Sequence, residues 1–121
     1  MAGRESLCRS ETIRQSADYL RCYRAGRRRS GKLILLYCHP NTQGVPRLGI
    51  TASRKVGPSV LRHRLKRRIR EAFRRLPERA GLPAMDLVVH LQKAAGAAAY
   101  RELASELSKL LSQAARAFAS R

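Results

Sequence analysis

Apolar residues spaced three or four positions apart predict three helices in this chain. The first covers residues 16–25, with Ser16 as its N-cap and Gly26 directly after its end. The second begins near Pro58, which suits the first helical position, and its pattern runs through residues 60–76. The third is a long C-terminal helix whose apolar residues are Tyr100, Leu103, Leu107, Leu110, Leu111, Ala114 and Phe118.

Short apolar or alternating segments predict the strands. Residues 33–38 and 86–91 are apolar runs of strand length, and residues 47–54 alternate between apolar and polar positions. The basic stretch at 27–31 interrupts the pattern and is expected to be a loop. The order is therefore α-β-β-β-α-β-α. It includes one strand, between residues 33–38 and 47–54, that is not assigned to particular residues. This order is typical of an α+β fold, here a single-domain α/β sandwich with helices packed on one sheet.

The alternating segment 47–54 has two different faces. Leu48, Ile50 and Ala52 share one face, which suits a buried core. The other face carries small and hydroxyl side chains beside one arginine: Arg47, Gly49, Thr51 and Ser53. A single extended strand of a partner could lie close against such a face.

Charge changes the picture most. The 121 residues include 26 Lys and Arg against 8 Asp and Glu, a formal net charge of +18. Such an excess repels itself in a compact fold and is typical of proteins that bind polyanions. Nucleic acid is the first partner to consider and an anionic membrane surface the second. A basic protein with no polyanionic partner is the plainest alternative.

The length and the cysteines limit the remaining classes. We expect a flexible basic N-terminus at residues 1–10 and one domain at residues 11–121. Three cysteines without a CxxC pair favour reduced thiols over a disulfide framework or a zinc site. No run of about 18 apolar residues is present to span a membrane. We therefore expect a soluble, cytoplasmic protein.

Basic residues gather on the turn before the second helix and on that helix. On a helical wheel, Arg62, Lys66 and Arg70 form one stripe, and a second stripe holds Arg64, Arg67 and Arg68. Guanidinium groups bind phosphates in bidentate fashion, so two stripes suit a folded RNA. The alternative is an ordinary solvated helix face. Membrane binding fits less well, because the apolar side of this helix is needed to cover the sheet.

Tyr19 and Tyr23 are four positions apart and share one face of the first helix. The pair could simply pack in the core. It could instead be a stacking platform for unpaired bases, and the basic residues near it favour RNA.

No protein active site is apparent. The carboxylates show no paired spacing for acid–base catalysis or metal binding, and the three histidines are scattered. His90 lies in an apolar strand, where a structural role is favoured. A protein-only nuclease would need a metal–carboxylate site that this pattern lacks.

Three motifs resemble the protein component of bacterial ribonuclease P: RLGITASRKVG from Arg47, VLRHRLKR from Val60 and REAFR from Arg70. The resemblance extends over about residues 13–111. It includes the Tyr19, Tyr23 and Gly26 pattern of the first helix. It implies a sandwich like the second domain of ribosomal protein S5, with a left-handed βαβ crossover. That hand would be an exception to the usual right-handed rule.

The same resemblance implies a function. The protein would bind the catalytic RNA and the 5′ leader of precursor tRNA and assist endonucleolytic removal of the leader, with no further protein partner and no membrane. It would be an enzyme component with no catalytic residue of its own. The RNA would cleave, using Mg²⁺ held mainly by RNA and substrate. The alternative is a ribosomal or assembly RNA-binding protein without a role in tRNA processing.

The implied site residues fall into two sets. Those expected to bind RNA are Arg54, Lys55, Arg62, His63, Arg64, Lys66, Arg67, Arg68 and Arg70. The leader-binding cleft would contain Tyr19, Tyr23, Thr51 and Ser53. The sequence departs from the family pattern twice, since His63 stands where Asn is customary and both cleft aromatics are Tyr where Phe is common.

Overall fold

A computed structural model describes residues 11–119, apart from the side chains of Glu78, Ala80 and Ala119. Its elements are α1 (Ser16–Ala25), β1 (Arg27–Ser30), β2 (Ile34–Pro40), β3 (Arg47–Ala52), α2 (Ser59–Arg75), β4 (Met85–Leu91) and α3 (Tyr100–Ala119). Three short 3₁₀ turns are Arg54–Val56, Pro77–Gly81 and Lys93–Ala97. The expected α+β class and element order are confirmed. The flexible terminus predicted at 1–10 lies outside the described residues.

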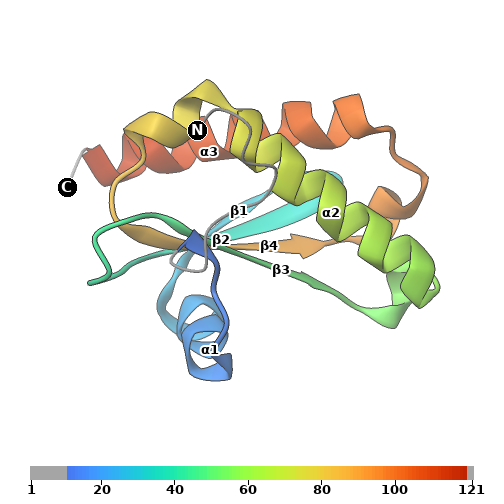
Figure 1. Ribbon diagram of the computed structural model, residues 1–121, viewed down its shortest axis with the longest axis horizontal. Coiled ribbons are helices and arrows are strands. Elements are labelled where there is room, and N and C mark those ends of the chain that lie inside the picture. Colours follow the sequence, from blue (N-terminus) through green and yellow to red (C-terminus); the bar gives the residue numbers. More distant parts are fainter. Residues whose placement is uncertain (1–10, 120–121) are drawn as a thin grey trace, which may run out of the picture.

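The chain forms three layers around one sheet. Figure 1 shows α2 and α3 along one face of the sheet and α1 on the other. The strand order is β1-β2-β4-β3, in which only the β3–β4 pair is parallel. The crossover from β3 through α2 to β4 has the left hand that the resemblance implies (Figure 1).

The prediction of a loop at residues 27–31 is wrong. Arg27–Ser30 forms the edge strand β1, which pairs antiparallel with β2. The strand that the sequence analysis could not assign to particular residues therefore precedes the apolar run of β2 and does not follow it. A four-residue edge strand with three arginines has no apolar alternation to identify it. Charge along such an edge also opposes pairing with another chain.

The ends of α1 differ from the prediction. Gln15 is the N-cap residue and makes no side-chain cap, so Ser16 is the first helical residue. Gly26 does not take the left-handed conformation expected after a helix, since its φ is −77°. Space explains the glycine instead. A Cβ at this position would lie 2.4 Å from the Cys22 carbonyl oxygen and 2.9 Å from that of Cys38.

The main core fills the space between the sheet and the helices α2 and α3. The apolar side predicted for the second helix packs there, with Leu65, Ile69, Ala72 and Phe73 buried. The expected apolar side of α3 does the same, with Leu103, Leu107, Leu110, Leu111 and Ala114 buried. A smaller cluster lies under α1 and consists of Ile13, Cys22 and Val88. The sheet thus has one thickly covered face and one thinly covered face.

Candidate nucleic-acid interface

The basic residues predicted to bind RNA lie on α2 and the turn before it. Burial of Leu65 and Ile69 turns the opposite side of α2 outward. His63, Arg64, Arg67 and Arg70 are exposed, and Arg62, Lys66 and Arg68 are half-buried. Arg54 and Lys55 are exposed on the 3₁₀ turn. The helix itself begins at Ser59, so Pro58 is its N-cap and not its first residue.

In the part of the chain that the structure describes, no neighbouring acid neutralises these cations. Within the described residues, none of the nine predicted RNA-binding residues forms an ion pair with a carboxylate. Glu71, the acid of this helix, pairs instead with Arg75, at 2.9 Å. Guanidinium groups without carboxylate partners keep their donors for phosphate oxygens.

Arg62 has a second role in the turn before α2. Its Nε donates a hydrogen bond to the Gly57 carbonyl oxygen, at 3.1 Å. Gly57 has a φ of 151°, which favours glycine, and a Cβ there would lie 2.6 Å from Leu61 Cδ2. The head group predicted to lie where helix meets sheet therefore lies against the connection from β3 to α2, which it helps to hold.

Tyr19 packs from α1 onto β3. Its ring lies directly over Gly49, where a Cβ would come within 2.6 Å of the ring. The Tyr19 hydroxyl donates to the Ile13 carbonyl oxygen, at 3.4 Å. Burial raises the pKa of Tyr19, and the nearby Arg70 guanidinium opposes that rise. Tyr19 thus packs on β3, the strand that leads through the turn Arg54–Val56 into α2.

Tyr23 is held by a polar chain and by another ring. Its hydroxyl is 2.6 Å from Thr51 Oγ1, which in turn is 2.9 Å from His90 Nδ1. The rings of Tyr23 and Tyr37 meet edge to face, with centroids 4.7 Å apart. We call Tyr19, Tyr23, Tyr37, Thr51 and His90 the tyrosine face. Within the described residues, Ser53 makes no hydrogen bond to this group, although it is exposed just beyond β3.

The core-packing interpretation of the tyrosine pair holds in part, while the stacking platform stays a prediction. Tyr19 and Tyr23 pack against the buried cluster beneath α1, yet each remains partly exposed. His90 and Tyr37 were absent from the predicted site. No local sequence signal identifies them, because Thr51 and His90 meet only through the register of β3 with β4, and Tyr37 belongs to the group through its contact with the Tyr23 ring.

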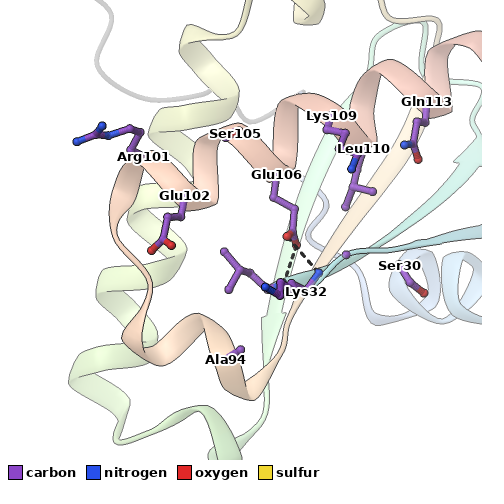
Figure 2. A pocket seen from close by; sticks show the side chains of 12 residues that line it. Ser30, Lys32, Ala94, Arg101, Glu102, Ser105, Glu106, Lys109, Leu110 and Gln113 are labelled. Carbon is purple, nitrogen blue, oxygen red and sulfur yellow. Dashed lines mark hydrogen bonds between the residues drawn. The ribbon is translucent and has the colours of Figure 1, made fainter.

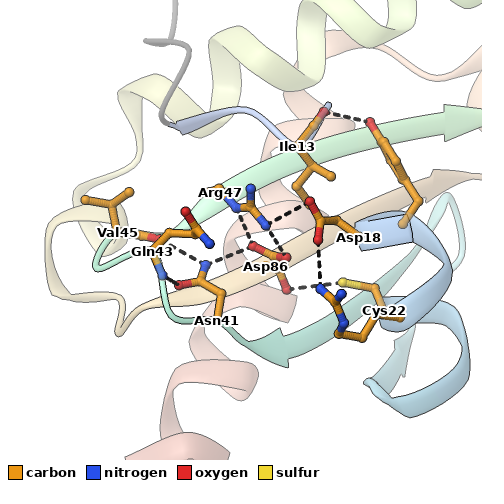
Figure 3. Close-up of polar contacts among 10 residues, drawn as sticks. Ile13, Asp18, Cys22, Asn41, Gln43, Val45, Arg47 and Asp86 are labelled. Carbon is orange, nitrogen blue, oxygen red and sulfur yellow. Dashed lines mark hydrogen bonds and ion pairs between the residues drawn. The ribbon is translucent and has the colours of Figure 1, made fainter. Parts of the chain in front are cut away.

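A buried ion-pair network fixes α1 beside this face (Figure 3). The Nε and Nη2 of Arg47 donate to the two carboxylate oxygens of Asp86, each at 2.7 Å. Arg47 also lies 3.3 Å from Asp18 on α1, which pairs with Arg21 at 2.7 Å. Asn41 Nδ2 donates to Asp86 at 2.8 Å. The hydrogen bond to Asp86 and the charges of Asp86 and Asp18 raise the pKa of Arg47. The carboxylates of Asp18 and Asp86 are therefore both engaged in structural contacts.

A groove between the β1–β2 hairpin and α3 contains none of the predicted site residues (Figure 2). Its central contact is structural. The Glu106 carboxylate accepts hydrogen bonds from the backbone N–H groups of Lys32, Leu33 and Ile34, at 3.1, 2.8 and 2.8 Å. Glu106 thus ties α3 to the end of the hairpin.

Residues 11–119 contain neither a metal-binding cluster nor a membrane-spanning helix. No three His, Cys, Asp or Glu side chains gather there where they could hold a metal ion. In the same part of the chain, no helix is both long and apolar enough to cross a bilayer.

The fold and the exposed cations define a small α+β protein of the nucleic-acid-binding class, with a basic helix beside an aromatic face. The family model for ribonuclease P matches residues 7–115. The ribonuclease P protein component of Clostridium kluyveri is 35% identical over 103 residues, which cover 84% of this chain and 92% of that protein.

Solved structures agree with this match. The RNase P protein of Staphylococcus aureus superposes with a TM-score of 0.78 and 30% identity, covering 86% of this chain and 94% of the other. That of Thermotoga maritima gives a TM-score of 0.75 and 28% identity, covering 85% and 96%. The chain belongs to the ribonuclease P protein family.

Proposed function

We propose that this protein is the protein subunit of a bacterial ribonuclease P. It binds the catalytic RNA along α2 and holds the 5′ leader of precursor tRNA on the tyrosine face, assisting removal of the leader. The observation that carries the proposal is the contiguity of the two surfaces. The Tyr19 ring lies on Gly49 of the edge strand β3, and β3 leads through the turn Arg54–Val56 directly into α2, so one bound RNA can contact both.

The basic side of α2 supplies affinity for RNA. Its cations project from one rigid helix and can neutralise several phosphates at fixed spacing. Each neutralised phosphate releases counterions, so binding weakens as salt rises. Arg54 and Lys55 extend the same charge beyond the start of the helix.

The tyrosine face supplies contacts to the unpaired leader. Exposed parts of Tyr19 and Tyr23 can stack on bases, which contributes about 1–3 kcal/mol per base. Gly49 is covered by the Tyr19 ring, so the open face expected along β3 is limited to the positions after it. Thr51 and Ser53 add hydroxyl groups along the same strand.

In this proposal the RNA subunit performs the cleavage. Mg²⁺ is held mainly by that RNA and the substrate, and no step runs through a metal ion held by this chain. Asp18 and Asp86 are engaged by arginines, which leaves them poorly suited as metal ligands. The free thiols of Cys22 and Cys38 are consistent with work in the reducing cytoplasm.

Reconstitution with a bacterial ribonuclease P RNA at low Mg²⁺ and physiological salt tests the proposal. The protein is expected to enhance leader cleavage, and to cleave nothing alone. Cleavage by the protein alone would overturn the division of labour. The absence of enhancement would leave a ribosomal or assembly RNA-binding role as the better account.

A double variant tests the surface of α2. Replacing Arg64 and Arg67 by Ala should weaken RNA affinity and flatten the slope of log K against log salt by about 0.9 for each phosphate that the protein no longer neutralises. The matched control replaces Arg101 and Lys109 of α3, two exposed cations on another surface, and should leave the slope unchanged. Equal slopes for both double variants would mean that the α2 cations are merely solvated.

A further inference from the structure

Three side chains from three elements form one hydrogen-bonded chain on the tyrosine face. Tyr23 on α1 meets Thr51 on β3 at 2.6 Å, and Thr51 meets His90 on β4 at 2.9 Å. Thr51 and His90 are register partners in the parallel β3–β4 pair, so the sheet itself sets their contact. The chain runs from the sheet to a ring that is still partly exposed.

The hydrogens in this chain are coupled, because each hydroxyl carries only one. When His90 Nδ1 has no proton, Thr51 donates to it, and Tyr23 donates to Thr51. When Nδ1 carries a proton, His90 donates to Thr51, and Thr51 donates to the Tyr23 oxygen. The hydroxyl hydrogen of Tyr23 is then released for an outside acceptor. The neutral ring carries its proton on Nδ1 or on Nε2, so it provides an outward donor at Tyr23 or at Nε2 but not at both. Only the doubly protonated ring provides both donors.

In the free protein, the surroundings of His90 do not stabilise its protonated ring. Burial lowers the pKa of His90. The titratable group that faces it is Tyr23 of α1, and Tyr37 of β2 contacts the Tyr23 ring in turn. β3 contributes Thr51, which does not titrate. On β1, Arg28 is the register partner of Tyr37 and is itself cationic. Within the described residues, Nε2 has no hydrogen-bond partner.

We propose that His90 is a proton-linked specificity residue for single-stranded RNA, which takes a second proton when an acceptor oxygen of the leader binds, so that its Nε2–H and the Tyr23 hydroxyl both donate outward. The bound RNA supplies the negative charge that the tyrosine face lacks. The inference rests on the proposed function, since it takes the leader to be the ligand of this face.

The sign of the pH dependence follows from linkage. Binding raises the pKa of His90 above its value in the free protein. The resulting gain in affinity is present in full below the free-state pKa and is lost as pH rises through the bound-state pKa. A rise of about one unit corresponds to about a tenfold gain in affinity.

The test compares two substrates of the holoenzyme reconstituted with a bacterial ribonuclease P RNA. The quantity measured is the leader effect, which is the Kd for leaderless tRNA divided by the Kd for precursor tRNA, under conditions that slow cleavage. This leader effect should grow about threefold to tenfold between pH 8 and pH 6. It should become independent of pH in His90→Ile and in Thr51→Val. The second variant keeps the histidine but removes the hydroxyl that links it to Tyr23. His39→Gln, at another partly exposed histidine of the sheet, should keep the full pH dependence.

A spectroscopic measurement separates a proton switch from a folding defect. In the ¹⁵N-labelled wild-type protein, the ring nitrogens of His90 report its pKa directly. That pKa should rise when a single-stranded leader RNA is added, and an unchanged value would overturn the inference.

The outcomes for the two proposals differ. A leader effect that is large but equal at both pH values, and unaltered in Thr51→Val, would refute the role of His90 and leave the proposed function standing. A leader that adds no affinity at either pH would refute both.

Discussion

The two faces of the sheet are built on different principles. The face toward α2 and α3 is closed by aliphatic side chains and Phe73, with Leu36, Leu87 and Leu107 fully buried. Among the described residues, the cluster on the face toward α1 has three buried apolar residues, and this face relies on the Arg47–Asp86 ion pair. The first face buries apolar area, which is the main source of stability. The second keeps polar groups and half-exposed rings available for a ligand, so stability and binding can be altered separately.

The largest expected effect comes from the closed face. Phe73→Ala removes a fully buried ring between α2 and the sheet and should lower the free energy of unfolding by about 3–5 kcal/mol. Urea unfolding followed by circular dichroism measures this loss. Val60→Ala, at a residue that is 69% exposed on the same helix, should change it by less than about 0.5 kcal/mol. Similar losses in both variants would contradict the assignment of this face as the core.

The next effect tests whether the polar face depends on its ion pair. Arg47→Met leaves the Asp86 carboxylate buried without its charged partner and should cost about 2–4 kcal/mol. Arg21→Met removes the other arginine that pairs with Asp18, but its side chain is 51% exposed, so the loss should stay below about 0.5 kcal/mol. Thermal unfolding of both variants gives the comparison. An Arg47→Met variant as stable as the wild-type protein would mean that apolar packing alone holds α1 on the sheet.

The network around Arg47 also shows what sequence could and could not predict. Alternation along β3 correctly separated Leu48 and Ile50 from Arg47 and Thr51. Alternation assigns a face but no register. The pairs Arg47–Asp86 and Thr51–His90 follow from the alignment of β3 with β4, across 39 residues of chain. No local pattern contains that alignment.

The helix α2 and the edge strand β1 also differed in how far the sequence could predict them. The second helix was predicted with its buried and basic sides because a period of 3.6 residues separates them wherever one side is apolar. β1 has no apolar residue to reveal its pairing, and only the hairpin with β2 makes Arg27–Ser30 a strand. The exposure of the basic side of α2 was therefore predictable, while the contacts of His90 and Tyr37 required the folded sheet.

A smaller effect is expected where α3 meets the hairpin. Glu106→Ala removes the acceptor of three backbone N–H groups, two of them partly buried, and should cost about 1–3 kcal/mol. Glu71→Ala, which removes an exposed acid that pairs on α2, should cost less than about 0.5 kcal/mol. Hydrogen exchange should also quicken at Leu33 and Ile34 in the first variant. Unchanged exchange there would show that the hairpin is held without Glu106.

The smallest effect compares how readily the two faces open. Burial raises the pKa of both Cys22 and Cys38 to about 12, so neither thiol should react with iodoacetamide at pH 8 while it stays buried. Reaction then requires opening. Cys22 is the buried residue of α1 and belongs to the small cluster, whereas Cys38 belongs to the main core.

Peptide mass spectrometry can follow alkylation at the two positions in one sample. Cys22 should be modified about tenfold faster, the ratio that corresponds to an opening free energy about 1.4 kcal/mol lower on the polar face. Bound leader RNA should slow Cys22 more than Cys38, because it stabilises α1 on the sheet. Equal rates at both thiols would mean that the two faces open together, and that the polar face is not a separate, looser layer.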